Sequence, residues 1–266
     1  MDRLTGGLRW IVKGAALIAL LFLTLPIVAL VIRVVQNQAW QDAPASAVPD
    51  AIWLSFVTTS ITVVITLAFG TPLAYLLAHW RGRLPRLISV LVELPIVLPP
   101  AVAGLALLIT FGRRGLLGGV LSAADISLAF TTTAVIMAQA FVAAPFYIRA
   151  AQVGFAGVPR DLEDAARVDG AGDATLFLYI TLPLASRALG AGLVLMWARA
   201  LGEFGATILF AGSLQGRTQT MPLLIYNVIE RDIDAAIWTG LLLIGVALVA
   251  LVISHLLGRK DGDPLA

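Results

Sequence analysis

The chain has no cysteine and only two histidines among its 266 residues. Without cysteine it can form no disulfide, no thiolate metal site and no cysteine nucleophile. His79 and His255 lie far apart, each near the end of an apolar stretch, so we expect both at a membrane interface rather than at a metal. No convergent set of acids, bases or metal ligands stands out elsewhere. The sequence therefore predicts neither a metal centre nor a catalytic site, which argues against a membrane enzyme.

Charged residues are also scarce, at 13% of the chain. The 18 Lys and Arg nearly balance the 16 Asp and Glu, so the calculated pI of 9.3 does not indicate a nucleic-acid-binding surface. Apolar residues make up 59% of the chain, and the mean hydropathy is +0.94. This composition lies outside the range of soluble proteins and predicts an integral membrane protein.

Six apolar stretches are long enough to cross a bilayer, which requires about 20 residues of helix because every backbone polar group must be satisfied within the segment. The first stretch is long for a signal peptide and is followed by no clear cleavage site, so we expect an uncleaved span. We predict an all-α membrane protein with about six transmembrane helices in one domain, residues 1–266. The predicted spans are residues 10–35, 51–79, 87–111, 128–150, 184–210 and 236–257.

Basic residues divide unevenly between the two sets of loops, and Lys and Arg prefer the cytoplasmic side. One set holds twelve of them: Arg3, Arg9, Lys13, Arg81, Arg83, Arg86, Arg149, Arg160, Arg167, Arg187, Arg259 and Lys260. The other set holds five: Arg33, Arg113, Arg114, Arg217 and Arg231. We therefore predict cytoplasmic termini and an inward-facing segment 151–183. The adjacent Arg113 and Arg114 oppose this rule, which indicates a role for them outside.

Prolines interrupt the third predicted span at Pro95, Pro99 and Pro100. Each removes an amide donor and clashes with the preceding turn. Broken backbone at membrane depth is tolerated where it packs against protein or lines a wet cavity. Two interpretations stay open, a kink required for packing and a lining of the transport path.

Arg199 and Glu203 lie four residues apart in the fifth predicted span, hence on one helix face. Intramembrane charges are costly and usually face a partner or a water-filled path. The pair either neutralises itself and fixes helix packing, or gives a passing oxyanion a favourable local field. Four glycines on this span predict close helix contacts: Gly190, Gly192, Gly202 and Gly205.

The loop 159–183 between the fourth and fifth spans predicts a short helix followed by a second one near Asp173. Pro159 suits a first helical turn, and Gly170 suits a left-handed C-terminal position. One face carries small or short side chains: Leu162, Ala165, Ala166 and Asp169. A membrane-surface helix would show bulky apolar residues opposite Lys or Arg. The acidic, alanine-rich pattern instead favours insertion into a protein groove.

This loop resembles the EAA loop of ABC importer permeases, written E-A-A-x3-G-x9-I-x-L-P. Here Asp164-Ala165-Ala166 is followed at the same spacing by Gly170 and by residues 180–183, so only the first of seven fixed positions differs. The resemblance implies an inward-facing coupling helix that docks on an ATP-hydrolysing partner subunit. The implied coupling residues are Leu162, Glu163, Asp164, Ala165, Ala166, Asp169 and Gly170.

The chain itself lacks the sequence of a nucleotide site. A P-loop requires Gly-Lys-Ser/Thr, because the lysine reaches the outer phosphates and the hydroxyl binds magnesium. The lysines are Lys13, followed by Gly14, and Lys260, followed by Asp261. We therefore expect no cofactor in this chain, with ATP and Mg²⁺ bound by a separate polypeptide.

Four further segments resemble the molybdate permease family: residues 93–100, 111–115, 199–207 and 218–226. The resemblance implies a homodimer in a bacterial or archaeal plasma membrane, served by ATPase subunits and an extracytoplasmic binding protein. Molybdate is the implied cargo, with sulfate and tungstate as alternatives, and Pro99, Pro100, Arg199 and Glu203 are the candidate path residues. An ion-coupled secondary transporter is the rival from another class, but it predicts inverted repeats and leaves the loop 159–183 without a role.

Overall fold

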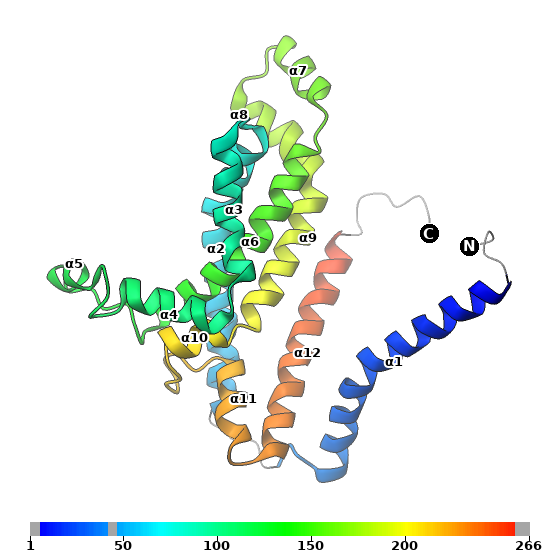
Figure 1. Cartoon of the computed structure of the whole chain (residues 1–266), viewed down its shortest axis with the longest axis vertical. Helices are drawn as coiled ribbons and strands as arrows, with labels where there is room; N and C mark the ends of the chain where they lie inside the picture. The colour runs from blue at the N-terminus through cyan, green and yellow to red at the C-terminus, as the bar shows by residue number, and fades with distance from the viewer. Residues whose placement is uncertain (1–5, 42–46, 259–266) are drawn as a thin grey trace.

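The computed structural model describes residues 6–41 and 47–258, and all regular structure in these ranges is helical (Figure 1). Arg3, Arg259 and Lys260, which contributed to the predicted orientation, lie outside the described residues, as does the side chain of His255. The elements are α1 (Gly6–Asn37), α2 (Ala47–His79), α3 (Arg83–Val97), α4 (Pro100–Phe111), α5 (Gly118–Ala123), α6 (Thr132–Ala156), α7 (Arg160–Val168), α8 (Asp173–Leu176), the π-helix η1 (Phe177–Thr181), α9 (Leu182–Leu201), α10 (Gly205–Phe210), α11 (Met221–Ile229) and α12 (Ile233–Gly258).

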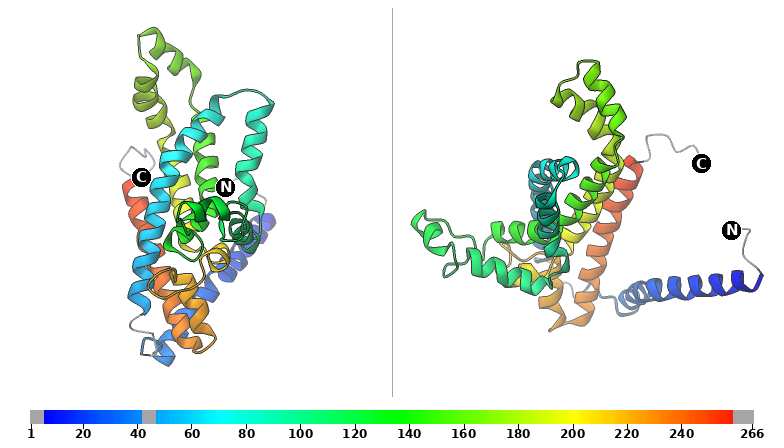
Figure 2. Two further views of the ribbon diagram at one scale, coloured as in Figure 1. Left: turned by 90° about the vertical axis from the view of Figure 1, so that its left-hand side faces the viewer. Right: turned by 45° about the horizontal axis from the view of Figure 1, so that its top comes forward.

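The helices α2, α6 and α9 form the centre of the molecule and pack side by side along α6 (Figures 1 and 2). Tyr147, Phe155 and Met196 are buried between them. Gly192 lies so close to α6 that a Cβ atom there would stand 2.5 Å from the Cβ of Ala150. Small residues at such crossings let backbones approach, which is how helices gain packing energy in a membrane.

Polar side chains also join α2 to α6 inside this core. Thr62 donates to the amide oxygen of Gln139 at 3.2 Å, and the amide nitrogen of Gln139 lies 3.5 Å from Thr59 Oγ1. All three side chains are buried. Because a buried polar group needs a partner, these hydrogen bonds fix the rotation of α2 against α6.

The third predicted span, 87–111, is broken at Leu98 and Pro99, among the prolines that the sequence analysis identified as interruptions. The axes of α3 and α4 differ by 113°. Leu98 and Pro99 between them are extended, with ψ of 134° and 132°, because a residue that precedes a proline avoids the helical region. Pro100 then occupies the first turn of α4, where its missing amide costs nothing. As a result α4 and α5 project sideways from the core (Figure 2).

The fifth predicted span, 184–210, is also not one helix. The segment enters through α8 and η1, continues as α9 to Leu201, and starts again as α10 at Gly205. Between them, Glu203 turns back and its Oε1 accepts a hydrogen bond from the backbone amide of Ala206 at 2.7 Å. The carboxylate therefore satisfies a free amide at the start of α10, as N-terminal capping side chains do.

Four described helices are long and apolar enough to span a membrane, or five if the bent α3 and α4 count as one span. The predicted spans 10–35, 51–79 and 128–150 correspond to α1, α2 and α6. In α12 the apolar stretch within the described residues is shorter, Ile233–Val249. The predicted count of six is therefore not reached by these criteria.

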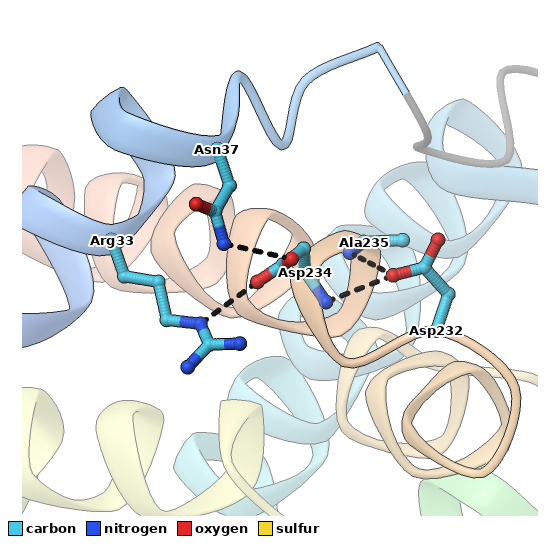
Figure 3. A network of polar contacts seen from close by, with 5 residues as sticks. All are labelled: Arg33, Asn37, Asp232, Asp234 and Ala235. Atoms are coloured by element: carbon cyan, nitrogen blue, oxygen red, sulfur yellow. Dashed lines mark hydrogen bonds and ion pairs between the residues drawn. The ribbon is translucent and has the colours of Figure 1, made fainter.

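The helix α1 leans away from the rest of the molecule, and none of its most apolar 18-residue stretch is buried (Figure 2). Polar contacts near its C-terminal end tie it to the start of α12, as Figure 3 shows. Arg33 Nε and the amide of Asn37 donate to the two carboxylate oxygens of Asp234, at 2.8 and 2.9 Å. Asp232 caps α12 by accepting from the amides of Asp234 and Ala235, at 2.9 and 3.0 Å.

Candidate functional site

The predicted short helix in the loop 159–183 is present as α7, which lies beyond the core at one end of the molecule (Figure 1). It has nine residues, with Asp161 and Glu163 in the first turn and Arg167 in the last, as the helix dipole favours. It ends before Gly170, whose φ of +89° lies in the left-handed region that glycine adopts without strain. The second helix, α8, begins at Asp173 as expected.

Most of the predicted coupling residues lie on the outside of α7. Leu162 is 47% exposed, Asp164, Ala165 and Asp169 are exposed, and Ala166 is half-buried. Asp164 lies 3.6 Å from Arg167 in an exposed ion pair, which contributes little to stability. A free face of short side chains at the end of a membrane protein can enter a groove of another protein.

Glu163 differs from its neighbours because it faces the chain's own core and is only 4% exposed. Thr181 Oγ1 donates to Glu163 Oε1 at 2.8 Å, and His79 Nε2 lies 3.6 Å from the same oxygen. The sequence analysis placed His79 at a membrane interface and did not predict its contact with Glu163. The one feature of the sequence that agrees with this contact is that Glu163 lies off the helix face formed by Leu162, Ala165 and Asp169.

Arg199 and Glu203 form the predicted ion pair, near the opposite end of α9 from α7. Arg199 Nη1 lies 2.6 Å from Glu203 Oε2, and Glu203 is only 1% exposed. Pro100, one of the predicted path residues, lies close to this pair. A Cβ atom on Gly205, two residues after Glu203, would stand 2.7 Å from the Cβ of Pro100. The structure therefore brings the break before α4 and the break before α10 to one place.

The predicted close-packing glycines divide into two classes. A Cβ atom at Gly192 or Gly205 would collide with a neighbouring element, which confirms their role in helix contacts. At Gly190 such an atom would meet nothing within 4 Å, and at Gly202 it would meet only Ala198 O at 3.6 Å. Within this single chain, neither of these last two positions makes a close helix contact.

Arg113 lines an open cavity of about 420 Å³ at the far side of α4, together with Arg217. The loop that carries Arg113 is tightly folded, because Leu116 and Leu117 donate backbone hydrogen bonds to Ile109 and Thr110 at 2.8 and 2.9 Å. Thr132 Oγ1 donates to the carbonyl oxygen of Arg217 at 2.9 Å and holds the second loop. Arg113 and Arg217, from two different loops, therefore line one cavity. Over the described ranges no group of three metal-ligating side chains gathers there or elsewhere.

Comparison with known proteins places this arrangement in a family. Residues 70–260 match the family described as binding-protein-dependent transport system inner membrane component. The chain belongs to this family. Membership excludes the ion-coupled secondary transporter and confirms the importer family to which the motif Asp164-Ala165-Ala166 pointed.

Relatives within this transport family are similar over most of their length. The "Molybdenum transport system permease protein ModB" of Mycobacterium tuberculosis is 43% identical over 239 residues, which cover 90% of each chain. The "Sulfate transport system permease protein CysW" of Synechococcus elongatus is 34% identical over 214 residues, covering 80% of this chain and 75% of its own. The family resemblance drawn from the sequence is therefore confirmed.

A solved transporter shows the same fold. A chain of a bacterial alginate ABC transporter, solved in complex with an alginate pentasaccharide-bound periplasmic protein, superposes with a TM-score of 0.77. The match covers 95% of this chain and 94% of that chain at 17% identity. This chain therefore has the helical fold of an ABC transporter membrane component.

Proposed function

We propose that this chain is the membrane permease of an ATP-driven importer for molybdate. The observation that carries the proposal is the exposed face of α7, in a chain that is 43% identical to a molybdenum transport permease over 90% of its length. The lower identity to the sulfate permease, 34%, makes sulfate the weaker candidate cargo. Tungstate has the same tetrahedral oxyanion chemistry and is the competitor that a transport assay needs to include.

The working assembly consists of two copies of this chain, two ATPase subunits and an external binding protein. ATP and Mg²⁺ are held by the ATPases, so this chain carries out no covalent chemistry. The alginate transporter whose chain superposes on this one was solved with a periplasmic protein, which supports a binding-protein partner for this chain. With α7 inside, both termini lie in the cytoplasm of a bacterial or archaeal cell.

Because the ATPase docks on α7, its conformational change during ATP binding moves α7. When ATP closes the ATPases, they draw the two copies of α7 together, and the motion of each α7 passes to α8, η1 and α9, which follow it in the chain. The other end of α9 carries Arg199, and the adjoining Glu203 caps α10. We place the transport path beside this region, where Pro99 and Pro100 break the backbone between α3 and α4.

Two glycines close to α7 provide a matched test of docking. Gly170 has a φ of +89°, whereas Gly172 has a φ of −72°, and a Cβ atom at either position would meet open space. Gly170→Ala strains the backbone by about 1–2 kcal/mol, whereas Gly172→Ala does not. We expect the first variant to lose most of its ATPase during purification and the second to retain it.

Uptake of labelled molybdate into vesicles that contain the permease, its ATPase and the binding protein measures function directly. We expect ATP-dependent uptake that Gly170→Ala reduces and Gly172→Ala preserves. If the wild-type chain binds no ATPase, or if ATP drives no molybdate uptake, the proposed function is wrong. Excess sulfate, tungstate and unlabelled molybdate are compared as competitors. If sulfate or tungstate suppresses uptake more strongly than molybdate does, that oxyanion is the cargo instead.

A further inference from the structure

Glu163 is the one predicted coupling residue whose side chain is withdrawn from the outer face of α7. It is 4% exposed, although Leu162 and Asp164 on either side are both exposed. Burial of a carboxylate costs free energy unless hydrogen bonds or an opposite charge compensate for it. Neighbouring side chains on the same short helix are exposed to solvent. The burial of the Glu163 carboxylate therefore indicates that it makes specific contacts with the rest of the chain.

Two elements far apart in the sequence supply the partners of this carboxylate. Thr181, with no exposed surface, belongs to the π-helix η1 that leads into α9, and its hydroxyl donates to Glu163 at 2.8 Å. His79 is the last residue of α2, and its Nε2 lies 3.6 Å from the same oxygen. Single π-helical turns within helices occur often at functional sites.

Aromatic packing fixes the histidine in this position. Its Nδ1 lies 2.9 Å from the carbonyl oxygen of Tyr75, which leaves Nε2 directed at Glu163. The Tyr75 ring lies against His79 at 4.3 Å and meets Phe155 and Phe177 edge-on, at 5.5 and 5.0 Å between ring centroids. The aromatic rings thus belong to α2, α6 and η1, so the histidine is held by the core and not by α7.

We infer that Glu163 is a positioning residue that clamps α7 onto α2 and η1, and that this clamp transmits the motion of the ATPase to two spanning helices at once. The inference rests on the proposed function and divides the predicted coupling residues into two sets. Leu162, Ala165 and Asp169 face outward toward the partner, and Glu163 faces inward. Without the clamp α7 would be joined to the core mainly through the chain at its two ends, and it could move while α2 and α9 stayed in place.

Substitution of Thr181 tests the clamp without altering the docking face. Thr181→Val removes the hydroxyl but keeps the volume, and Thr181→Ser restores the hydroxyl. Loss of a hydrogen bond to a charged group lowers the ratio of clamped to released α7 at least about tenfold. Thr24→Val is a control for the loss of a threonine hydroxyl away from the clamp, because Thr24 is exposed on α1 and its hydroxyl donates to Leu20 of its own helix, at 2.8 Å.

The readout is the number of ATP molecules hydrolysed per molybdate imported in reconstituted vesicles. We expect Thr181→Val to keep its ATPase bound and hydrolysing while this ratio rises about tenfold, and Thr181→Ser and Thr24→Val to match the wild type. Glu163→Gln, which retains an acceptor for Thr181 but not the charge that faces His79, is expected to fall between them.

Two results would overturn the clamp. One is an unchanged ratio in both Thr181→Val and Glu163→Gln, since neither the hydrogen bond nor the charge would then matter for coupling. The other is loss of the ATPase from Glu163→Gln with a normal ratio in Thr181→Val, since Glu163 would then belong to the docking face. Failure of the proposed function itself is distinct, because the wild-type complex would already show no ATP-driven uptake.

Discussion

Arg199 and Glu203 form an ion pair in which the two partners differ in exposure. The Glu203 side chain is 1% exposed and that of Arg199 is 27% exposed. Glu203 also accepts a hydrogen bond from the amide of Ala206, so its carboxylate serves both the ion pair and the cap of α10. Removal of the arginine alone leaves a buried carboxylate without a counter-charge, which in other proteins costs about 3–5 kcal/mol.

Neutralising one or both members of this pair tests its contribution to the stability of the protein. We expect Arg199→Met to lower the melting temperature of the detergent-solubilised protein markedly. Arg199→Met combined with Glu203→Gln should recover most of it, because the amide oxygen of the glutamine can still accept from Ala206. Thermal unfolding followed by tryptophan fluorescence measures both. A double variant as unstable as Arg199→Met would show that the uncompensated charge is not the cause.

The same pair shows which side-chain contacts the sequence can predict and which it cannot. The spacing of four residues predicted that Arg199 and Glu203 would meet, since that distance brings side chains together on any helix. The cap on Ala206 was not predictable, because it exists only where α9 stops at Leu201. In the same way, the contact between Glu163 and His79 joins residues 84 positions apart in the sequence, and it depends on how α7 folds back.

The two broken spans differ in how far the sequence revealed them. Proline chemistry predicted the break between α3 and α4, because Pro99 and Pro100 are incompatible with the middle of a helix. The break between α9 and α10 contains Gly202, Glu203 and Phe204, which composition alone does not mark as a terminator. Its cause is tertiary: α10 turns to pack against α4, and a Cβ atom at Gly104 would stand 2.6 Å from the carbonyl oxygen of Ala206.

The contact of α4 with α10 can be tested with a pair of glycines. At Gly104 an added Cβ would collide with backbone atoms, whereas at Gly190, within α9, it would meet nothing within 4 Å. We expect Gly104→Ala to destabilise the protein by about 1–3 kcal/mol through overpacking. Gly190→Ala should be neutral or stabilising by about 0.5–1 kcal/mol, because alanine favours a helix interior. Equal melting temperatures for the two variants in detergent would argue against the close crossing.

At the scale of the whole molecule, composition and apolar run length predicted the class of protein, and the spacing of the loop motif predicted the family. They did not predict that α1 would lie apart from the core, because hydropathy reports an apolar environment without distinguishing lipid from protein. The attachment of α1 to α12 depends on Arg33, Asn37 and Asp234, which are polar residues at the ends of apolar runs. Such residues are usually interpreted as boundaries of spans and not as contacts between them.

The orientation of the molecule can be tested by cysteine labelling, since the chain has no cysteine of its own. Val168 at the end of α7 is 87% exposed, and Leu116 in the loop after α4 is 84% exposed, so the two positions are closely matched. The excess of basic residues near α7 predicts that α7 lies in the cytoplasm. A membrane-impermeant maleimide should therefore label Leu116→Cys in intact spheroplasts and Val168→Cys only after lysis. The reverse pattern would put α7 outside the cell, where no ATPase could dock, and would refute the coupling role of its exposed face.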